Sequence, residues 1–156
     1  MEEMKTIYQV EGKLCKDFIG QISYTVCLDQ TYEELDIEFS FEPQHYRPED
    51  VTPELKQRLL DYCKKEYGIE EPTPEEWEDA VYHGMKTEIH TMATLNDTFI
   101  GNIHRQLTTR HMHFTATEAT EGCIPQPTIA GVLKVTILVF SVLLDNTNYQ
   151  LTVRAR

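Results

Sequence analysis

The sequence predicts an α+β fold of about seven or eight mainly antiparallel strands. We expect these strands to form a curved sheet or a partly closed β-barrel, with two helices inserted between the third and the fourth strand. Apolar and polar residues alternate over residues 5–42 and again over residues 86–155, as in strands with one face against a core. Between them, a threonine is followed by a proline at 52–53 and again at 73–74, and both pairs are helix-start signals.

Residues 5–42 predict three strands, joined by turns near Lys16 and Asp29 and paired in order as a meander. Their apolar sets are Tyr8, Val10 and Leu14, then Ile22, Tyr24, Val26 and Leu28, then Leu35, Ile37, Phe39 and Phe41. The third strand is the clearest, because acidic residues and a serine occupy the alternate positions. Cys27 and Cys63 lie within patterned strand or helix positions, where a reduced thiol packs as a small apolar group.

The middle of the chain predicts helices over residues 52–67 and 74–84. Thr52 caps the first, and Gly68 ends it in a left-handed conformation. Thr73 caps the second, where Glu76 can reach back to the backbone N–H of Thr73. The expected buried faces are Leu55, Leu59, Tyr62 and Cys63 on the first helix, and Trp77, Ala80, Val81 and Gly84 on the second.

The last part of the chain, residues 86–155, predicts the remaining strands. The run 131–144 is apolar at both parities, which predicts a central strand covered on both faces. Asn96 and Asp97 tolerate the left-handed backbone of a tight hairpin. A two-residue turn there pairs His90 with Ile103, so that His90 and His104 point to opposite faces of the sheet.

The charge of this chain is concentrated in one segment of a single predicted domain, residues 1–156. The formal net charge is −12, and residues 33–88 hold 17 acidic and 6 basic residues, a net charge of −11. A protein of this charge is not expected to bind nucleic acid directly or to dock on an anionic membrane. A basic or neutral protein surface is the partner that this charge favours.

The composition predicts a cytoplasmic protein. The N-terminal residues lack the basic start and apolar run of a secretion signal. The most apolar stretch, 132–144, is too short to span a bilayer and contains Lys134. Four cysteines without a C-x-x-C pair indicate neither a disulfide framework nor a zinc knuckle.

The pair His111 and His113 is the sharpest local feature of the sequence. The H-x-H spacing puts two imidazoles on one face of a strand, as some metal sites require. The alternative is a solvated polar face, because Thr109 and Thr115 have the same parity. Glu118 has the opposite parity, which leaves no obvious carboxylate to complete the site.

Two further groups are candidates for a ligand site or a protein interface. His45, Tyr46 and Arg47 join the third strand to the first helix, where they can contact a polar ligand or serve as a plain connector. Trp77 and Tyr82 offer large contact areas with polar tips, although such side chains also anchor helices to a sheet.

The sequence contains no convincing catalytic constellation. Adjacent acids such as Glu75 and Glu76 suit the first turn of a helix, and Cys123 lies in a loop without an assignable base. The glycines form neither a G-x-G-x-x-G nor a Walker-type loop, and G-x-S-x-G does not occur. We therefore expect a protein without catalytic activity and without a cofactor.

The leading hypothesis is a small acidic binding or regulatory domain that contacts a basic or neutral protein partner. The first alternative is a small-molecule-binding protein that encloses its ligand within a curved sheet or barrel. The second is a metal-dependent enzyme that uses His111 and His113. Strand-mediated formation of a homo-oligomer is a separate prediction, because terminal strands either pair with each other or leave open edges.

Overall fold

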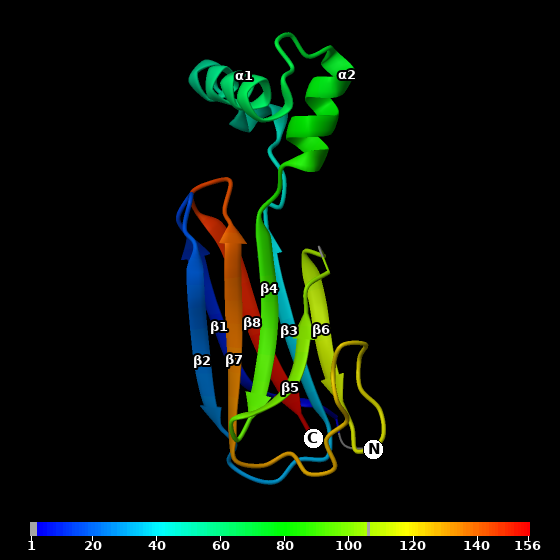
Figure 1. The fold of residues 1–156 in the computed structure, drawn as a ribbon. Helices are drawn as coiled ribbons and strands as arrows, with labels where there is room; N and C mark the ends of the chain where they lie inside the picture. The colour runs from blue at the N-terminus through cyan, green and yellow to red at the C-terminus, as the bar shows by residue number, and fades with distance from the viewer. Residues whose placement is uncertain (1–2, 106) are drawn as a thin grey trace.

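The computed structural model describes residues 3–105 and 107–156, and in this part of the chain the eight strands form two antiparallel four-stranded sheets (Figure 1). Sheet A has the order β1 (Lys5–Leu14), β8 (Thr147–Ala155), β3 (Leu35–Glu42) and β6 (Thr109–Phe114). Sheet B has the order β2 (Gly20–Cys27), β7 (Val132–Ser141), β4 (Glu88–Leu95) and β5 (Thr98–Ile103). The α+β class and the place of the helices between the third and fourth strands are confirmed.

The predicted meander is wrong, because β1, β2 and β3 alternate between two separate sheets. The predicted curved sheet or partly closed barrel is matched only in part, since the two sheets do not join into a closed barrel. β1 pairs with β8 and β2 pairs with β7, so the connection after Leu14 crosses from sheet A to sheet B. Alternation of apolar residues shows which face of a strand is buried, but it does not identify the neighbouring strand. The two terminal strands pair with each other along their whole length.

The space between the two sheets is filled with apolar side chains. One cluster, which includes Leu35, Met112, Phe114, Leu133 and Leu151, occupies most of the sandwich. A second cluster around Phe39, Ile137 and Tyr149 continues it toward one end. β7 lies between β2 and β4, as predicted for a central strand. Its outer face is covered only in part, however, because Val132 and Phe140 are exposed there while Thr136 is buried.

The segment between β3 and β4, residues 43–87, forms what we call the helical unit, which lies beyond one end of the sandwich (Figure 1). It contains a short 3-10 turn η1 (Pro48–Asp50), α1 (Pro53–Tyr67), α2 (Pro74–Trp77) and a π-helical continuation η2 (Glu78–Gly84). A small core of Tyr46, Leu59 and Val81 holds it together, with Leu143 and Leu144 of the β7–β8 connection packed against it. Within the described residues, none of the helices is long and apolar enough to cross a membrane.

The predicted helix ends are confirmed. The Thr52 hydroxyl accepts a hydrogen bond from the Leu55 N–H, and Gly68 ends α1 with φ of 68°. The Thr73 hydroxyl accepts from the Glu76 N–H, and the Glu76 carboxylate accepts from that hydroxyl rather than from the Thr73 N–H. The predicted burial of Tyr62 and Gly84 is wrong, since both are exposed.

The hairpin between β4 and β5 turns at Asn96 and Asp97, as predicted, with φ of 51° and 66°. A β-bulge between Ala93 and Thr94 shifts the register by one residue, so Ile103 lies opposite Thr91 instead of His90. The prediction that His90 and His104 point to opposite faces is therefore wrong. Their rings lie 5.9 Å apart between centroids.

Two cysteine positions differ in their burial. Cys63 is buried in α1, as predicted, whereas Cys27 is exposed. Cys27 has the opposite parity to Val26, which is buried, so its side chain lies on the outer face of sheet B. The prediction that Cys27 packs as a small apolar group is wrong.

Candidate functional site

His111 and His113 lie on the outer face of sheet A beside three acidic residues of β3 and the segment before it. The β3–β6 register places His111 opposite Glu38 and His113 opposite Asp36. His113 Nε2 lies 2.7 Å from a carboxylate oxygen of Glu34, and His113 Nδ1 lies 3.2 Å from Asp36. His111 Nδ1 lies 3.0 Å from the second oxygen of Asp36. Asp36 therefore joins both imidazoles.

Two arginines of the C-terminal strand complete this cluster. Arg154 Nη1 lies 3.0 Å from a carboxylate oxygen of Glu38, and Arg156 pairs with Glu34. Two of the three acids, Glu34 and Glu38, are thus paired with arginines. We call this group the sheet A ion-pair cluster, and its members are Glu34, Asp36, Glu38, His111, His113, Arg154 and Arg156.

The arrangement of this cluster bears on the metal hypothesis. Sequence analysis found no carboxylate near His111 and His113. In the structure, carboxylates of β3 and of the segment before it face the imidazole nitrogens. In the part of the chain that the structure describes, no group of three or more His, Cys, Asp or Glu side chains is arranged to hold a metal ion. Metal binding by His111 and His113 stays a prediction, and elemental analysis of the purified protein tests it.

Asp36→Asn is expected to lower the free energy of unfolding by about 1–3 kcal/mol, because a buried carboxylate bonded to two imidazoles is replaced by an amide with a single acceptor oxygen. Chemical denaturation measures this loss. Glu11→Gln is the matched control, since Glu11 lies exposed on β1. Equal stability of the two variants would show that the cluster contributes nothing to folding.

His45, Tyr46 and Arg47 each have a structural contact in the helical unit. His45 Nδ1 lies 3.0 Å from the backbone carbonyl of Met85, and Tyr46 is buried in the small core. The Arg47 guanidinium donates to both carboxylate oxygens of Asp50, at 3.0 and 3.1 Å, and this pairing lowers the pKa of Asp50. These contacts fix the connection between β3 and α1, and a role of the three residues in a ligand site or interface stays a prediction.

Trp77 and Tyr82 pack against the same small core, with Tyr46, Leu59 and Val81. The Lys56 ammonium lies 5.5 Å from the centre of the Trp77 ring, which ties α1 to α2. The structure thus places Tyr46, Trp77 and Tyr82 in one region, but as the packing that holds the helices together.

A groove of about 630 Å³ lies where the helical unit meets the end of sheet B. We call it the helical groove. Its lining residues come from α1, α2, η2, β4 and the end of β7. They are Tyr62, Cys63, Tyr67, Ile69, Glu76, Asp79, Ala80, Gly84, Met85, Lys86, Glu88, Ser141 and Leu143. The helical groove therefore combines a surface of the helices with the first residues of β4.

The chemistry of the helical groove is aromatic and acidic. The Tyr62 and Tyr67 rings meet edge to face with centroids 6.0 Å apart, and their side chains are 44% and 64% exposed. The side-chain hydrogen bond of the Tyr62 hydroxyl to Tyr67 raises the pKa of Tyr62. Glu76, Asp79 and Glu88 are the acidic lining residues, against the single base Lys86. Sequence reasoning missed this site, because it assigned Tyr62 to a buried stripe.

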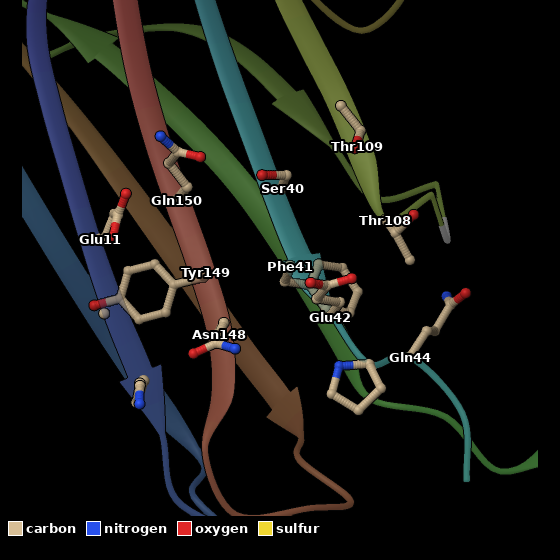
Figure 2. A pocket seen from close by; sticks show the side chains of 13 residues that line it. Glu11, Ser40, Phe41, Glu42, Gln44, Thr108, Thr109, Asn148, Tyr149 and Gln150 are labelled. Carbon is tan, nitrogen blue, oxygen red and sulfur yellow. The ribbon is translucent and has the colours of Figure 1, made fainter. Parts of the chain in front are cut away.

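A second groove, of about 890 Å³, lies on the outer face of sheet A near its helical end, and we call it the polar groove (Figure 2). Glu11, Gln150, Ser40 and Thr109 face one another in one row across the four strands. Asn148 lies one row nearer the helical end. Among the described residues, the side chains of Ser40, Thr109, Asn148 and Gln150 make no hydrogen bond with another protein group. These groups are available to a polar ligand.

Arg110, which is buried, and Cys123, which is half-buried, have perturbed pKa values and serve packing. Desolvation lowers the pKa of Arg110 to about 10, and its guanidinium donates to the backbone carbonyls of Ile89 and Leu107 at 2.5 and 2.7 Å. Burial raises the pKa of the Cys123 thiol, whose sulfur lies close to Gly101. A thiol of raised pKa is mostly protonated at neutral pH, which makes it a poor nucleophile.

The model of a family described as "Family of unknown function (DUF6669)" matches residues 1–156. No curated protein matches the chain.

Proposed function

The chain belongs to this family of unknown function, and we propose that it is a non-catalytic, cytosolic binding domain whose helical groove holds a basic segment of a partner protein. The observation that carries the proposal is the pair of exposed tyrosines beside Glu76, Asp79 and Glu88 in one groove. The four cysteines are free thiols, as in proteins of a reducing compartment.

The distribution of charge favours the helical groove over other surfaces for a basic partner. The helical unit, residues 43–87, holds 11 acidic and 6 basic residues, a net charge of −5. In contrast, Glu34, Asp36 and Glu38 already face arginines and histidines in the sheet A ion-pair cluster. The helical unit keeps a net negative charge, which attracts positive charge.

The side chains of the helical groove suit lysine and arginine in particular. A cation over the face of a tyrosine ring is stabilised by about 0.5–1 kcal/mol at an exposed site, and a neighbouring carboxylate adds a charge-assisted hydrogen bond. Tyr67 supplies an exposed ring, and Asp79 supplies an exposed carboxylate in the same groove. An extended segment with more than one basic side chain can use the tyrosines and the acids together.

Oligolysine and oligoarginine peptides are the direct probes of this proposal. Fluorescence anisotropy is expected to show saturable binding of a labelled basic peptide, with an affinity that falls as the salt concentration rises. A neutral peptide of the same length and a labelled oligonucleotide are the controls, and neither is expected to bind. Equal affinity for the basic and the neutral peptide would contradict the proposal.

A second candidate function is the binding of an uncharged polar small molecule in the polar groove. The observation that favours it is the set of uncommitted amide and hydroxyl groups on Ser40, Thr109, Asn148 and Gln150 (Figure 2). The site differs from the interior cavity that the sequence predicted, because apolar side chains fill the space between the sheets. A thermal-shift screen of polyols and saccharides tests it, and Gln150→Ala is expected to abolish any shift.

A further inference from the structure

Three of the four sheet edges carry features that protect them from pairing with another chain. β1 contains a bulge between Thr6 and Tyr8 and carries Lys5 and Lys13. Bulges and lysines are common means of blocking an edge strand. The loop after β6 covers the edge of β5, where the Ile124 N–H donates to the Ile100 carbonyl at 2.8 Å.

The same loop folds back over the end of β6. The Thr120 N–H donates to the His113 carbonyl at 3.0 Å, and the Gln126 N–H donates to the Thr115 carbonyl at 2.8 Å. An isolated bridge also joins Phe114 to Ala119. The side of the sandwich formed by β5 and β6 is therefore closed in large part by the chain itself.

β2 has none of these protections. Its eight residues, Gly20–Cys27, include no charged residue and no proline. Its register with β7 runs without a bulge from Gly20 to Cys27, and in the described part of the chain β7 is its only strand partner. Ile19, directly before the strand, is 73% exposed. A regular, uncharged edge strand of this kind is a template for pairing with another strand.

We propose that two copies of this chain associate by antiparallel pairing of β2 with β2 around a two-fold axis. The pairing joins the two copies of sheet B into one eight-stranded sheet, and it uses the same edge on both copies, as a two-fold interface requires. This proposal does not depend on the function of the helical groove.

The distribution of charge favours a second copy as the occupant of this edge. Each chain has a net charge of −12, which opposes association in general. The four strands of sheet B carry only Glu88 and Lys134 as charged residues, so little repulsion arises across this interface. Antiparallel pairing also places the two acidic helical units at opposite ends of the joined sheet, because each lies beyond the same end of its own sandwich (Figure 1).

The pleat of the strand limits the register of this pairing. Residues that face each other across the axis must lie on the same side of the sheet, so the axis passes at a residue and not between two residues. The two copies of the strand overlap most when that residue is Ser23 or Tyr24. In both registers Ile22 and Val26 stay on the core side, and Thr25 stays on the outer side. Thr25 lies one residue from the two-fold axis where the axis passes at Tyr24, and two residues from it where the axis passes at Ser23.

Thr25→Glu is the variant that tests the interface. Within one chain the new carboxylate lies opposite Lys134 of β7, which supports the fold. In the register with the axis at Tyr24 it places two like charges one residue on either side of the axis, so the dissociation constant of the dimer is expected to rise at least about tenfold. Gln9→Glu is the matched control, because it adds the same charge to an exposed position on the edge strand β1.

Light scattering over a wide range of protein concentration gives the readout. The wild-type protein and Gln9→Glu are expected to form dimers, and Thr25→Glu is expected to stay a monomer with an unchanged circular dichroism spectrum. Hydrogen exchange of the backbone amides of residues 20–27 is expected to slow in the wild-type protein as its concentration rises. A wild-type protein that stays monomeric throughout overturns the proposal, and so does dissociation by Gln9→Glu but not by Thr25→Glu.

Discussion

Arg110→Met is expected to lower the free energy of unfolding by about 2–4 kcal/mol, because buried carbonyls lose their donors. Arg110 is 3% exposed, and its guanidinium donates to the carbonyls of Ile89, Ile103 and Leu107. It therefore ties β4 and the end of β5 to the chain just before β6. Methionine keeps much of the apolar contact with Phe39 and Phe41 but donates no hydrogen bond. Urea denaturation measures the loss.

Arg105→Met is the control for this prediction. Arg105 pairs with Glu121 at 2.8 Å, but its side chain is 69% exposed. An exposed ion pair contributes about 1 kcal/mol or less, so Arg105→Met is expected to stay close to the wild-type stability. Equal stability of Arg110→Met and Arg105→Met would show that the hydrogen bonds from the Arg110 guanidinium to these backbone carbonyls do not stabilise the fold.

Asp79→Lys combined with Tyr67→Ala is expected to weaken the binding of a basic peptide by at least about tenfold. The first change replaces an attractive charge in the helical groove with a repulsive one, and the second removes the most exposed ring of the groove. Neither residue belongs to the small core of the helical unit, so the fold is expected to persist. Trp77 is the single tryptophan of the chain, and its fluorescence reports whether the helices remain packed.

Glu118→Lys makes the same reversal of charge away from the helical groove. Glu118 is exposed in the loop after β6, and this loop lies at the end of the sandwich opposite the helical unit (Figure 1). Its affinity for the peptide is expected to stay within about threefold of the wild type, because exposed charges farther apart than a Debye length of roughly 8–10 Å are largely screened. Equal losses in Glu118→Lys and in the groove variant would mean that the peptide responds to net charge alone.

The elements that local chemistry determines could be predicted from the sequence. Thr52 and Gly68 mark the ends of α1 because a hydroxyl cap and a left-handed glycine act within one turn. Asn96 and Asp97 mark a hairpin for the same local reason. The alternation in β3 correctly gave its core face, since parity depends on the strand alone.

The pairing of strands could not be predicted, because it depends on contacts between distant parts of the chain. Nothing in β1 identifies β8 as its neighbour. The bulge that moves His90 next to His104 has its extra residue, Ile100, beside Gly101 in β5. The π-helical end of the second helix was hidden for a similar reason. Its residues favour a helix, and the packing of Val81 accompanies the wider turn.

For the candidate sites too, the features set by local sequence could be predicted and those set by contacts between distant segments could not. The polarity of His111 and His113 was evident from their spacing, but their neighbours Asp36 and Glu34 come from a strand that the sequence did not place beside them. The helical groove was missed because Tyr62 has the spacing of a buried helix face, although it lies 44% exposed next to Tyr67.

The most direct test of the helical groove is a titration of the isotope-labelled protein with an oligoarginine peptide, followed by the backbone amide signals in NMR spectra. The proposed function predicts that the largest shifts fall on residues 62–88, with those of Tyr67, Asp79 and Glu88 among them. Largest shifts on the outer face of sheet A, or small shifts spread over all acidic residues, would contradict it.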